Sequence, residues 1–415
     1  MKANSFQASL ETVLAHSRPL AAEDISFHQA LGRVLAEDVA AATDDPPAPK
    51  SAMDGFALRA ADTRRAGAQA PATFKFSEVV GAGHLARGKA GKGRAVRLMT
   101  GALLPSGADA VVKQEDTRPA GEGAFSLIQP LEPGENVIPA GARLKKGETP
   151  LRAGEVIGPQ ALGMLASLNR TRLSVVRRPR VALLALGDEL VELGQALGPG
   201  QLHVSHLYAL EAKVGKYGGE PRRLGIAVDD PELILRLLEP RVADSGPENP
   251  LACEMVLTLG GSHGGDFDFA HHVLQALGAE VHFRRTRLSL GGSTLFATLG
   301  PRLLFGLPGT PVPSLGAFEL LVRPALWRLA GRSELEHPRL QARLTAPVSA
   351  WPQATCFCPG WLSFDAAGQA SVTPLRDRGQ AGPRNGTLAN ALIEVPEGAA
   401  GLKLGEMAAV QWLGE

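Results

Sequence analysis

The apolar positions in the first part of the chain follow two different patterns. At residues 6–35 they recur every three to four positions in two segments, which predicts a helix, a turn and a second helix. Residues 74–129 instead contain short apolar runs between glycine- and proline-rich turns, which is typical of a compact β module. Helical spacing returns at residues 157–168. We therefore expect the β module to be inserted into a split helical domain.

Fully apolar runs alternate with helical patterns in the next part of the chain. The run at residues 181–186 has strand length and ends at Gly187, which predicts a buried strand. Similar runs lie at residues 222–226, 255–259, 281–283 and 303–305, with helical patterns between them at 205–217, 231–242 and 268–277. This alternation predicts a doubly wound, mainly parallel sheet. Ligands of such sheets bind at the carboxyl ends of the strands.

Changes in these patterns predict the domain boundaries. Prolines after two acidic residues at 44–49 interrupt regular structure, because proline lacks an amide proton. Short alternating strands return near the C-terminus and predict a small β domain. We expect a split helical domain, an inserted β domain, an α/β domain and a C-terminal β domain, at residues 5–45 with 143–178, 46–142, 179–331 and 335–415 respectively.

Composition and charge narrow the classes of partner and compartment. The 415 residues carry 43 Lys and Arg against 42 Asp and Glu, so no global charge favours a nucleic acid or an anionic membrane. Cys253, Cys356 and Cys358 give no disulfide framework, and Cys356 and Cys358 would point to one face of a strand as buried thiols. Without an export pattern or an apolar run of about twenty residues, we expect a cytoplasmic protein.

Three loops at predicted strand ends carry candidate chemistry. Asp188 and Glu189 follow the first strand and could bind a divalent cation or orient water; the alternative is an acidic pair that complements a helix dipole. The glycine-rich loop at residues 260–268 would let backbone amides approach an anion. Residues 305–313 place prolines around a helix start, either as a rigid phosphate- or pterin-binding corner or as a plain strand-to-helix connection.

The sequence contains no pattern typical of phosphate-loop, dinucleotide-binding or zinc-binding proteins. The sequence lacks the phosphate loop GxxxxGK[ST] and a strand-linked GxGxxG fingerprint. His271, His272 and His282 have no Cys or carboxylate partners at zinc spacing, so we assign no zinc site.

Several phrases, in order, resemble one known family, the molybdopterin molybdenumtransferases. Residues 51–59 read SAMDGFALR, residues 97–102 read RLMTGA, and residues 107–112 read GADAVV. The phrases GDEL at residues 187–190 and GLPG at residues 306–309 extend the resemblance through the sheet domain. It covers nearly the whole chain.

The resemblance implies a fold and a reaction. The fold would be an elongated homodimer, with a split helical domain, an inserted β domain, a molybdopterin-binding-like α/β domain and a C-terminal β barrel. The reaction would insert molybdate into adenylylated molybdopterin, with Mg²⁺-assisted cleavage of the pyrophosphate and release of AMP. A molybdopterin adenylyltransferase is the implied protein partner.

The resemblance also implies roles for individual residues. Those carried over as catalytic are Asp54, Thr100, Asp188, Glu189 and Asp268. Three of them, Asp188, Glu189 and Asp268, would coordinate Mg²⁺. Those carried over as cofactor-binding are Gly187, Gly260, Gly261, Gly265, Pro308, Gly309 and Pro311. In the implied homodimer, one subunit's inserted domain would bring Asp54 and Thr100 toward the other's carboxylates.

The sequence departs from the family pattern at several polar positions. Ser289 and Gly292 stand where the family has lysines, and Arg143 stands at an expected acidic position. Leu186 and His263 replace a threonine and a serine, and the serine-rich segment expected near residues 382–386 is absent. The lost ammonium groups would have neutralised phosphate or molybdate, a role that is open to Arg284, Arg285 and Arg287.

Two hypotheses follow from these departures. The first is an active molybdenum insertase with a modified site. The second is a divergent, noncatalytic paralogue that binds a pterin, a nucleotide or a protein partner. Molybdate-dependent AMP release separates them.

Overall fold

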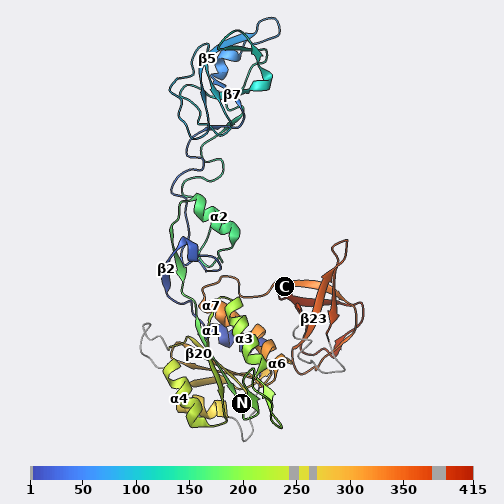
Figure 1. The fold of residues 1–415 in the computed structure, drawn as a ribbon. Helices are drawn as coiled ribbons and strands as arrows, with labels where there is room; N and C mark the ends of the chain where they lie inside the picture. The colour runs from blue at the N-terminus through green and yellow to red at the C-terminus, as the bar shows by residue number, and fades with distance from the viewer. Residues whose placement is uncertain (1–2, 243–251, 261–268, 376–388, 415) are drawn as a thin grey trace. The chain divides into compact units, whose positions relative to one another are not determined.

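The chain forms two compact units in the computed structural model, which describes residues 3–242, 252–260, 269–375 and 389–414 (Figure 1). The first unit comprises residues 1–37, 153–162 and 170–415, and the second comprises residues 38–152 and 163–169. Each unit has hydrophobic clusters of its own.

A six-stranded sheet forms the centre of the first unit. Its order is β15-β12-β16-β20-β19-β17, where the strands are Glu220–Ala227, Arg180–Leu186, Met255–Leu259, Arg302–Leu307, Leu295–Leu299 and Glu280–Phe283. The first four strands are parallel, whereas β19 runs antiparallel to both β20 and β17. The mainly parallel sheet is confirmed. The apolar pattern did not predict β19.

Helices cover both faces of this sheet (Figure 1). Alternate residues of β12 divide between two cores, with Leu183 on one face and Leu184 on the other. This burial on both faces explains the unbroken apolar run. The core that contains Leu183 packs α1 (Phe6–His16), α3 (Ser205–Lys216), α6 (Pro311–Ala317), η4 (Phe318–Val322) and α7 (Arg323–Leu329); the opposite core packs α4 (Pro231–Val242) and α5 (Phe269–Ala276).

The prediction of two helices at residues 6–35 is half wrong. Helix α1 forms as expected, and the Ser5 Oγ caps it by accepting from the Ala8 N–H at 3.2 Å. The second segment forms strand β2 (Ala22–Ser26) and a 3₁₀ turn, η1 (Phe27–Gln29). Strand β2 pairs antiparallel with β11 (Arg172–Val176). The backbone hydrogen bonds of this segment are therefore made to a distant strand, although its apolar spacing predicted a helix. The helix predicted at 157–168 is α2 (Pro159–Ser167).

The second unit contains a separate six-stranded sheet. Its order is β7-β4-β6-β5-β9-β8, where the strands are Ala110–Lys113, Gly55–Leu58, Arg94–Leu98, Ala72–Val80, Ala124–Leu127 and Arg118–Pro119. Phe56, Phe74 and Phe125 stack in its core, with ring centroids 4.0 and 5.6 Å from that of Phe125. The predicted β module is therefore present, and it begins earlier than the apolar runs indicated.

The C-terminal segment closes into a five-stranded barrel. Its order is β21-β24-β23-β25-β27, with strands Arg339–Leu344, Ala370–Pro374, Cys356–Phe364, Ala391–Val395 and Met407–Trp412. Cys356 and Cys358 both lie in its apolar core, as their spacing predicted.

Short elements complete the described chain. They are β1 (Asn4–Ser5), β3 (Lys50–Ser51), η2 (Ala60–Thr63), η3 (Gln114–Asp116), β10 (Val137–Ile138), β13 (Leu190–Val191), β14 (Leu202–His203), β18 (Thr286–Arg287), β22 (Val348–Ser349) and β26 (Gly401–Leu402). Among the described helices, none is both long enough and apolar enough to span a membrane.

Candidate functional site

The predicted acidic loop lies directly after β12. Gly187 turns the chain with φ +150°, and a Cβ at this position would lie 2.4 Å from the Glu189 Oε2. The positive φ favours glycine here, because other residues rarely adopt this conformation, whereas the flexible Glu189 side chain could move away from a Cβ. The Gly187 N–H donates to the Ala227 carbonyl at 3.2 Å, and this bond joins the loop to the end of β15.

A third carboxylate, Asp229, lies beside this loop in the segment after β15, and it was not among the site residues predicted from the sequence. Its backbone N–H donates to the Asp188 Oδ1 at 3.1 Å. Burial, followed by the charges of Asp188 and Glu189, raises the pKa of Asp229 above its usual value. The sequence does contain a signal: Asp229 directly follows the strand that neighbours β12, so both strand ends meet at one edge of the sheet.

Gly260 and Gly309 bring two further strand ends close together. Gly260 has φ +101°, and a Cβ there would lie 2.6 Å from the Leu186 carbonyl oxygen. A Cβ on Gly309 would lie 3.3 Å from the Gly260 Cα. The Gly260 N–H donates to the Leu307 carbonyl at 3.0 Å, so this amide is already hydrogen-bonded to the neighbouring strand. Close backbone approach, rather than anion binding by its own amide, explains glycine at position 260.

The proline-containing corner leads from β20 into α6. Pro311 is the first residue of α6, where proline costs least because its missing N–H would have no helical partner. Pro308 and Gly309 precede it and connect the strand to the helix. The remaining predicted residues of the glycine-rich loop, Gly261, Gly265 and Asp268, lie outside the described residues.

Asp54 and Thr100 form a hydrogen-bonded pair in the second unit. The Asp54 Oδ1 accepts from both the backbone N–H and the Oγ1 of Thr100, each at 2.7 Å. These bonds, assisted by the charge of Arg97, lower the pKa of Asp54. Both side chains are exposed, so a ligand can reach the carboxylate and the hydroxyl.

Gly55 fixes the position of this pair. It lies in β4 opposite Lys113 of β7, and a Cβ here would lie 2.0 Å from the carbonyl oxygen of the preceding residue, Val112. Only glycine allows the two strands to pair here. The Asp54-Gly55 sequence thus combines a functional carboxylate with a requirement of the sheet.

The positions that lack family lysines are part of the packing. Ser289 joins the sheet domain to the barrel: its Oγ accepts from the Phe357 N–H at 2.9 Å and donates to the Phe357 carbonyl at 3.3 Å. A Cβ at Gly292 would lie 2.6 Å from the Leu288 carbonyl oxygen, so the present backbone leaves no space for a side chain.

The nearby arginines have partners of their own. The Arg287 Nε lies 2.9 Å from the Glu397 Oε1, and its Nη1 donates to the Ala3 carbonyl at 3.2 Å. Arg284 and Arg285 also interact with other groups. Arg143, at the expected acidic position, forms a long, exposed ion pair of 3.9 Å with Asp45, a type that contributes little stability.

The acidic loop offers oxygen donors for a hard cation. Among the described residues, however, no group of three or more His, Cys, Asp or Glu side chains converges to enclose a metal ion. An Mg²⁺ ion commonly keeps several waters and takes one or two protein carboxylates together with substrate phosphates. Asp188 and Glu189 fit such an open site.

Family models match three consecutive regions of the chain. The MoeA N-terminal region (domain I and II) matches residues 4–169, a probable molybdopterin binding domain matches residues 182–328, and the MoeA C-terminal region (domain IV) matches residues 341–413. The chain is 30% identical over 397 residues to a molybdopterin molybdenumtransferase of Staphylococcus aureus strain COL, covering 96% of this chain and 92% of the relative. It is 35% identical over 312 residues to the protein of that name from a Nostoc species, covering 74% of this chain and 70% of the relative.

Solved structures agree with these matches. The molybdopterin biosynthesis MoeA protein from Pyrococcus horikosii superposes with a TM-score of 0.87 and 30% identity over 100% of both chains. A second MoeA structure, from Pyrococcus horikoshii OT3, gives a TM-score of 0.84 and 27% identity over 99% of this chain and 100% of that one.

The fold, with its loops at the strand ends, places the chain in the class of molybdenum cofactor biosynthesis proteins. The match extends through all three family regions and most of the chain. The protein therefore belongs to the MoeA family of molybdopterin molybdenumtransferases.

Proposed function

We propose that the protein inserts molybdate into adenylylated molybdopterin and releases AMP. The carrying observation is the acidic loop, where Asp188, Glu189 and Asp229 gather at the end of the parallel strands. Carboxylates crowded together repel one another, and a divalent cation that binds there relieves the repulsion. Family membership supports the choice of substrate.

In this proposal Asp188 and Glu189 hold Mg²⁺, with Asp268 as a third ligand. Bound Mg²⁺ would supply charge neutralisation for a pyrophosphate oxygen. The Thr100 hydroxyl and the Asp54 carboxylate would bind and orient the substrate, since both are exposed and held together by hydrogen bonds. The corner formed by Pro308, Gly309 and Pro311, together with Gly187 and the loop containing Gly260, Gly261 and Gly265, would shape the pterin-binding surface.

Release of AMP from adenylylated molybdopterin tests this function. The protein, its Asp188→Asn variant and a Glu239→Gln control would be compared with Mg²⁺, with and without molybdate. Glu239 is an exposed carboxylate on α4 and serves as the matched charge removal. We expect AMP release that depends on molybdate. Asp188→Asn should reduce its rate by at least about a hundredfold, which corresponds to about 2.7 kcal/mol of transition-state stabilisation. Glu239→Gln should leave the rate unchanged. Substrate binding without any release would refute the insertase.

The second candidate function is that of a noncatalytic paralogue, because Ser289 and Gly292 stand where the family resemblance implies lysines. Their packing means that lysines cannot simply be restored in place. We expect Gly292→Lys to lower the melting temperature, with no gain in AMP release. A gain in release without loss of stability would instead indicate a decayed catalytic site.

The proposed assembly is a cytoplasmic homodimer that receives its substrate from a molybdopterin adenylyltransferase. Its expected mass is twice the 43.5 kDa of the chain. Light scattering of the purified protein tests the dimer. Transfer of adenylylated molybdopterin between the two purified proteins, without release into solution, tests the partner.

A further inference from the structure

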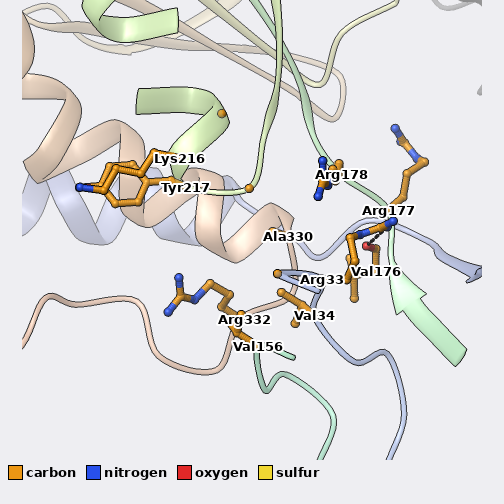
Figure 2. Close-up of a pocket in the computed structure, with 13 residues that line it drawn as sticks. Arg33, Val34, Val156, Val176, Arg177, Arg178, Lys216, Tyr217, Ala330 and Arg332 are labelled. Atoms are coloured by element: carbon orange, nitrogen blue, oxygen red, sulfur yellow. Dashed lines mark hydrogen bonds between the residues drawn. The ribbon is translucent and has the colours of Figure 1, made fainter. Parts of the chain in front are cut away.

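A basic pocket of about 200 Å³ lies in the first unit (Figure 2). Arg178 and Gly218 line it, and these residues precede β12 and β15. The acidic loop follows the same two strands. Because β12 has seven residues, and a strand rises about 3.3 Å per residue, the two places are separated by roughly 20 Å. The pocket therefore lies apart from the proposed catalytic loops.

Positive charge dominates the lining of this pocket. Its cationic residues enter from separate elements and are Arg33, Arg177, Arg178, Lys216 and Arg332 (Figure 2). Among the described residues that line it, none is acidic. The whole chain has a net charge of only +1, so this concentration of charge is local.

Carboxylates outside the lining balance part of this charge. Arg33 pairs with Glu23 and donates to the Val176 carbonyl at 2.9 Å. Arg177 pairs with Glu254 at 2.9 Å, a carboxylate that it shares with Arg180. These contacts explain two of the arginines as structural groups.

Arg178 and Arg332 are not balanced in this way. Arg178 is exposed, and within the described part of the chain its guanidinium makes no ion pair. Arg332 is partly buried, with its guanidinium carbon 3.6 Å from the centroid of the Trp327 ring. Burial lowers its pKa, opposed by the charge of Glu334, which forms no ion pair with it. A partly desolvated arginine of this kind gains from a charged hydrogen-bond acceptor.

The ends of two helices give an alternative explanation for part of this charge. Helices α3 and α7 end at the pocket, and cations favour helix C-termini. Several last-turn carbonyls are already satisfied, since the Tyr217 N–H donates to Lys213 and the Arg332 N–H donates to Trp327. The helix ends also do not explain Arg178, which precedes a strand.

We propose that this pocket binds a small tetrahedral oxyanion of the phosphate, sulfate or molybdate type, with Arg178 as its main charged contact. The Arg332 guanidinium points away from Arg178 (Figure 2) and adds positive charge at longer range. The size favours such an ion, because pockets for drug-sized ligands have volumes of about 300–1,000 Å³. Lys216 adds a third positive charge to the lining. Guanidinium groups suit these ions because they donate paired hydrogen bonds.

Isothermal titration calorimetry of the full chain with sodium phosphate tests the site at constant low ionic strength. Variants Arg178→Gln and Arg332→Gln would be compared with Arg328→Gln, an exposed arginine of α7 outside the lining. We expect saturable binding at one site, weakened roughly tenfold or more by Arg178→Gln, weakened less by Arg332→Gln and unchanged by the control. Arg332 also packs on Trp327, so Arg332→Gln could weaken binding by disturbing the fold. The decisive variant is therefore Arg178→Gln, provided that its melting temperature is unchanged.

Competition identifies the ion. Sulfate and molybdate should each displace phosphate from the same site, and their relative affinities show which oxyanion it prefers. Absence of saturable binding at millimolar phosphate would overturn the inference. Equal weakening by Arg328→Gln, or no weakening by Arg178→Gln, would overturn it as well. No molybdopterin is present in this measurement, so its result is independent of the insertase assay.

Discussion

The backbone N–H of Asp229 donates a 3.1 Å hydrogen bond to the Oδ1 of Asp188. This bond joins the ends of two parallel strands and gathers their carboxylates at one edge of the sheet. The pKa of Asp229 is raised, first by burial and then by Asp188 and Glu189. The loop is therefore organised at a cost in like-charge repulsion, which a bound cation would offset.

Asp229→Asn should raise the melting temperature at neutral pH in the absence of Mg²⁺. The folded state holds the Asp229 proton more tightly than the unfolded chain does, so this group lowers stability as the pH rises from its ordinary value of 3.8 through the raised one. Calorimetry at neutral pH measures the effect, with Glu239→Gln as the control. Mg²⁺ should then stabilise the native protein more than the variant; equal gains would count against a cation at this loop.

Thr100→Val should raise the pKa of Asp54. The substitution keeps the shape of the side chain but removes the Oγ1–H donor, while the backbone N–H of residue 100 still donates to the carboxylate. Because hydrogen bonds to a carboxylate favour its charged form, losing one moves the pKa back toward its usual value of 3.8. NMR titration of the Asp54 carboxyl group measures this change.

A suitable control is Thr117→Val, because Thr117 is a partly exposed threonine whose hydroxyl donates to the Gln114 carbonyl instead. In AMP release, Thr100→Val should lower activity and Thr117→Val should preserve it. If both variants were fully active, the proposed role of the Asp54 and Thr100 pair would be wrong.

Gly260→Ala should destabilise the sheet domain more than Gly278→Ala does. Both glycines have positive φ, +101° and +74°, so both substitutions incur backbone strain of roughly 1–3 kcal/mol. Only at position 260 does the added Cβ meet another atom, the Leu186 carbonyl oxygen at 2.6 Å; at Gly278 nothing lies within 4 Å. Denaturant unfolding of both variants isolates the contribution of close strand approach, and equal losses would show that φ alone requires glycine.

The sequence predicted the parts of the fold whose pattern reflects local burial. The apolar run of β12 indicated a strand covered on both faces, and the carboxylates after it were correctly placed at its end. Strand β2 could not be predicted in this way, because its only buried residue is Ile25 and its pairing with β11 joins segments far apart in the chain.

The site shows the same division between local and long-range information. Asp188 and Glu189 follow an obvious strand, whereas the contribution of Asp229 depends on which strand lies beside β12. The role of Gly292 likewise depends on the Leu288 carbonyl that folds over it. The family resemblance implied a missing lysine at this position, but only the backbone explains why a side chain is excluded.

Glu319 anchors a buried cluster of charges beside α3. It lies in the π-helical segment η4 and is only 3% exposed. Its carboxylate accepts from Lys213 Nζ at 2.5 Å, Tyr217 Oη at 3.0 Å, His337 Nε2 at 2.9 Å and lies 3.3 Å from Arg323 Nε. Although burial opposes ionisation, the hydrogen bonds and charges of His337 and Lys213 lower the pKa of Glu319 to about 2.

Glu319→Gln should therefore lower the free energy of unfolding by roughly 3–5 kcal/mol, because it leaves buried cations without their carboxylate. The native pKa of about 2 lies below the ordinary value of 4.5, so the stability from Glu319 is present above pH 4.5 and is lost as the pH falls toward 2. Denaturant unfolding between neutral and acidic pH should show a shallower acid loss in the variant. Glu334→Gln, at an exposed position, should match the native protein. A variant whose stability still fell as steeply as the native protein's would assign the acid sensitivity to other carboxylates.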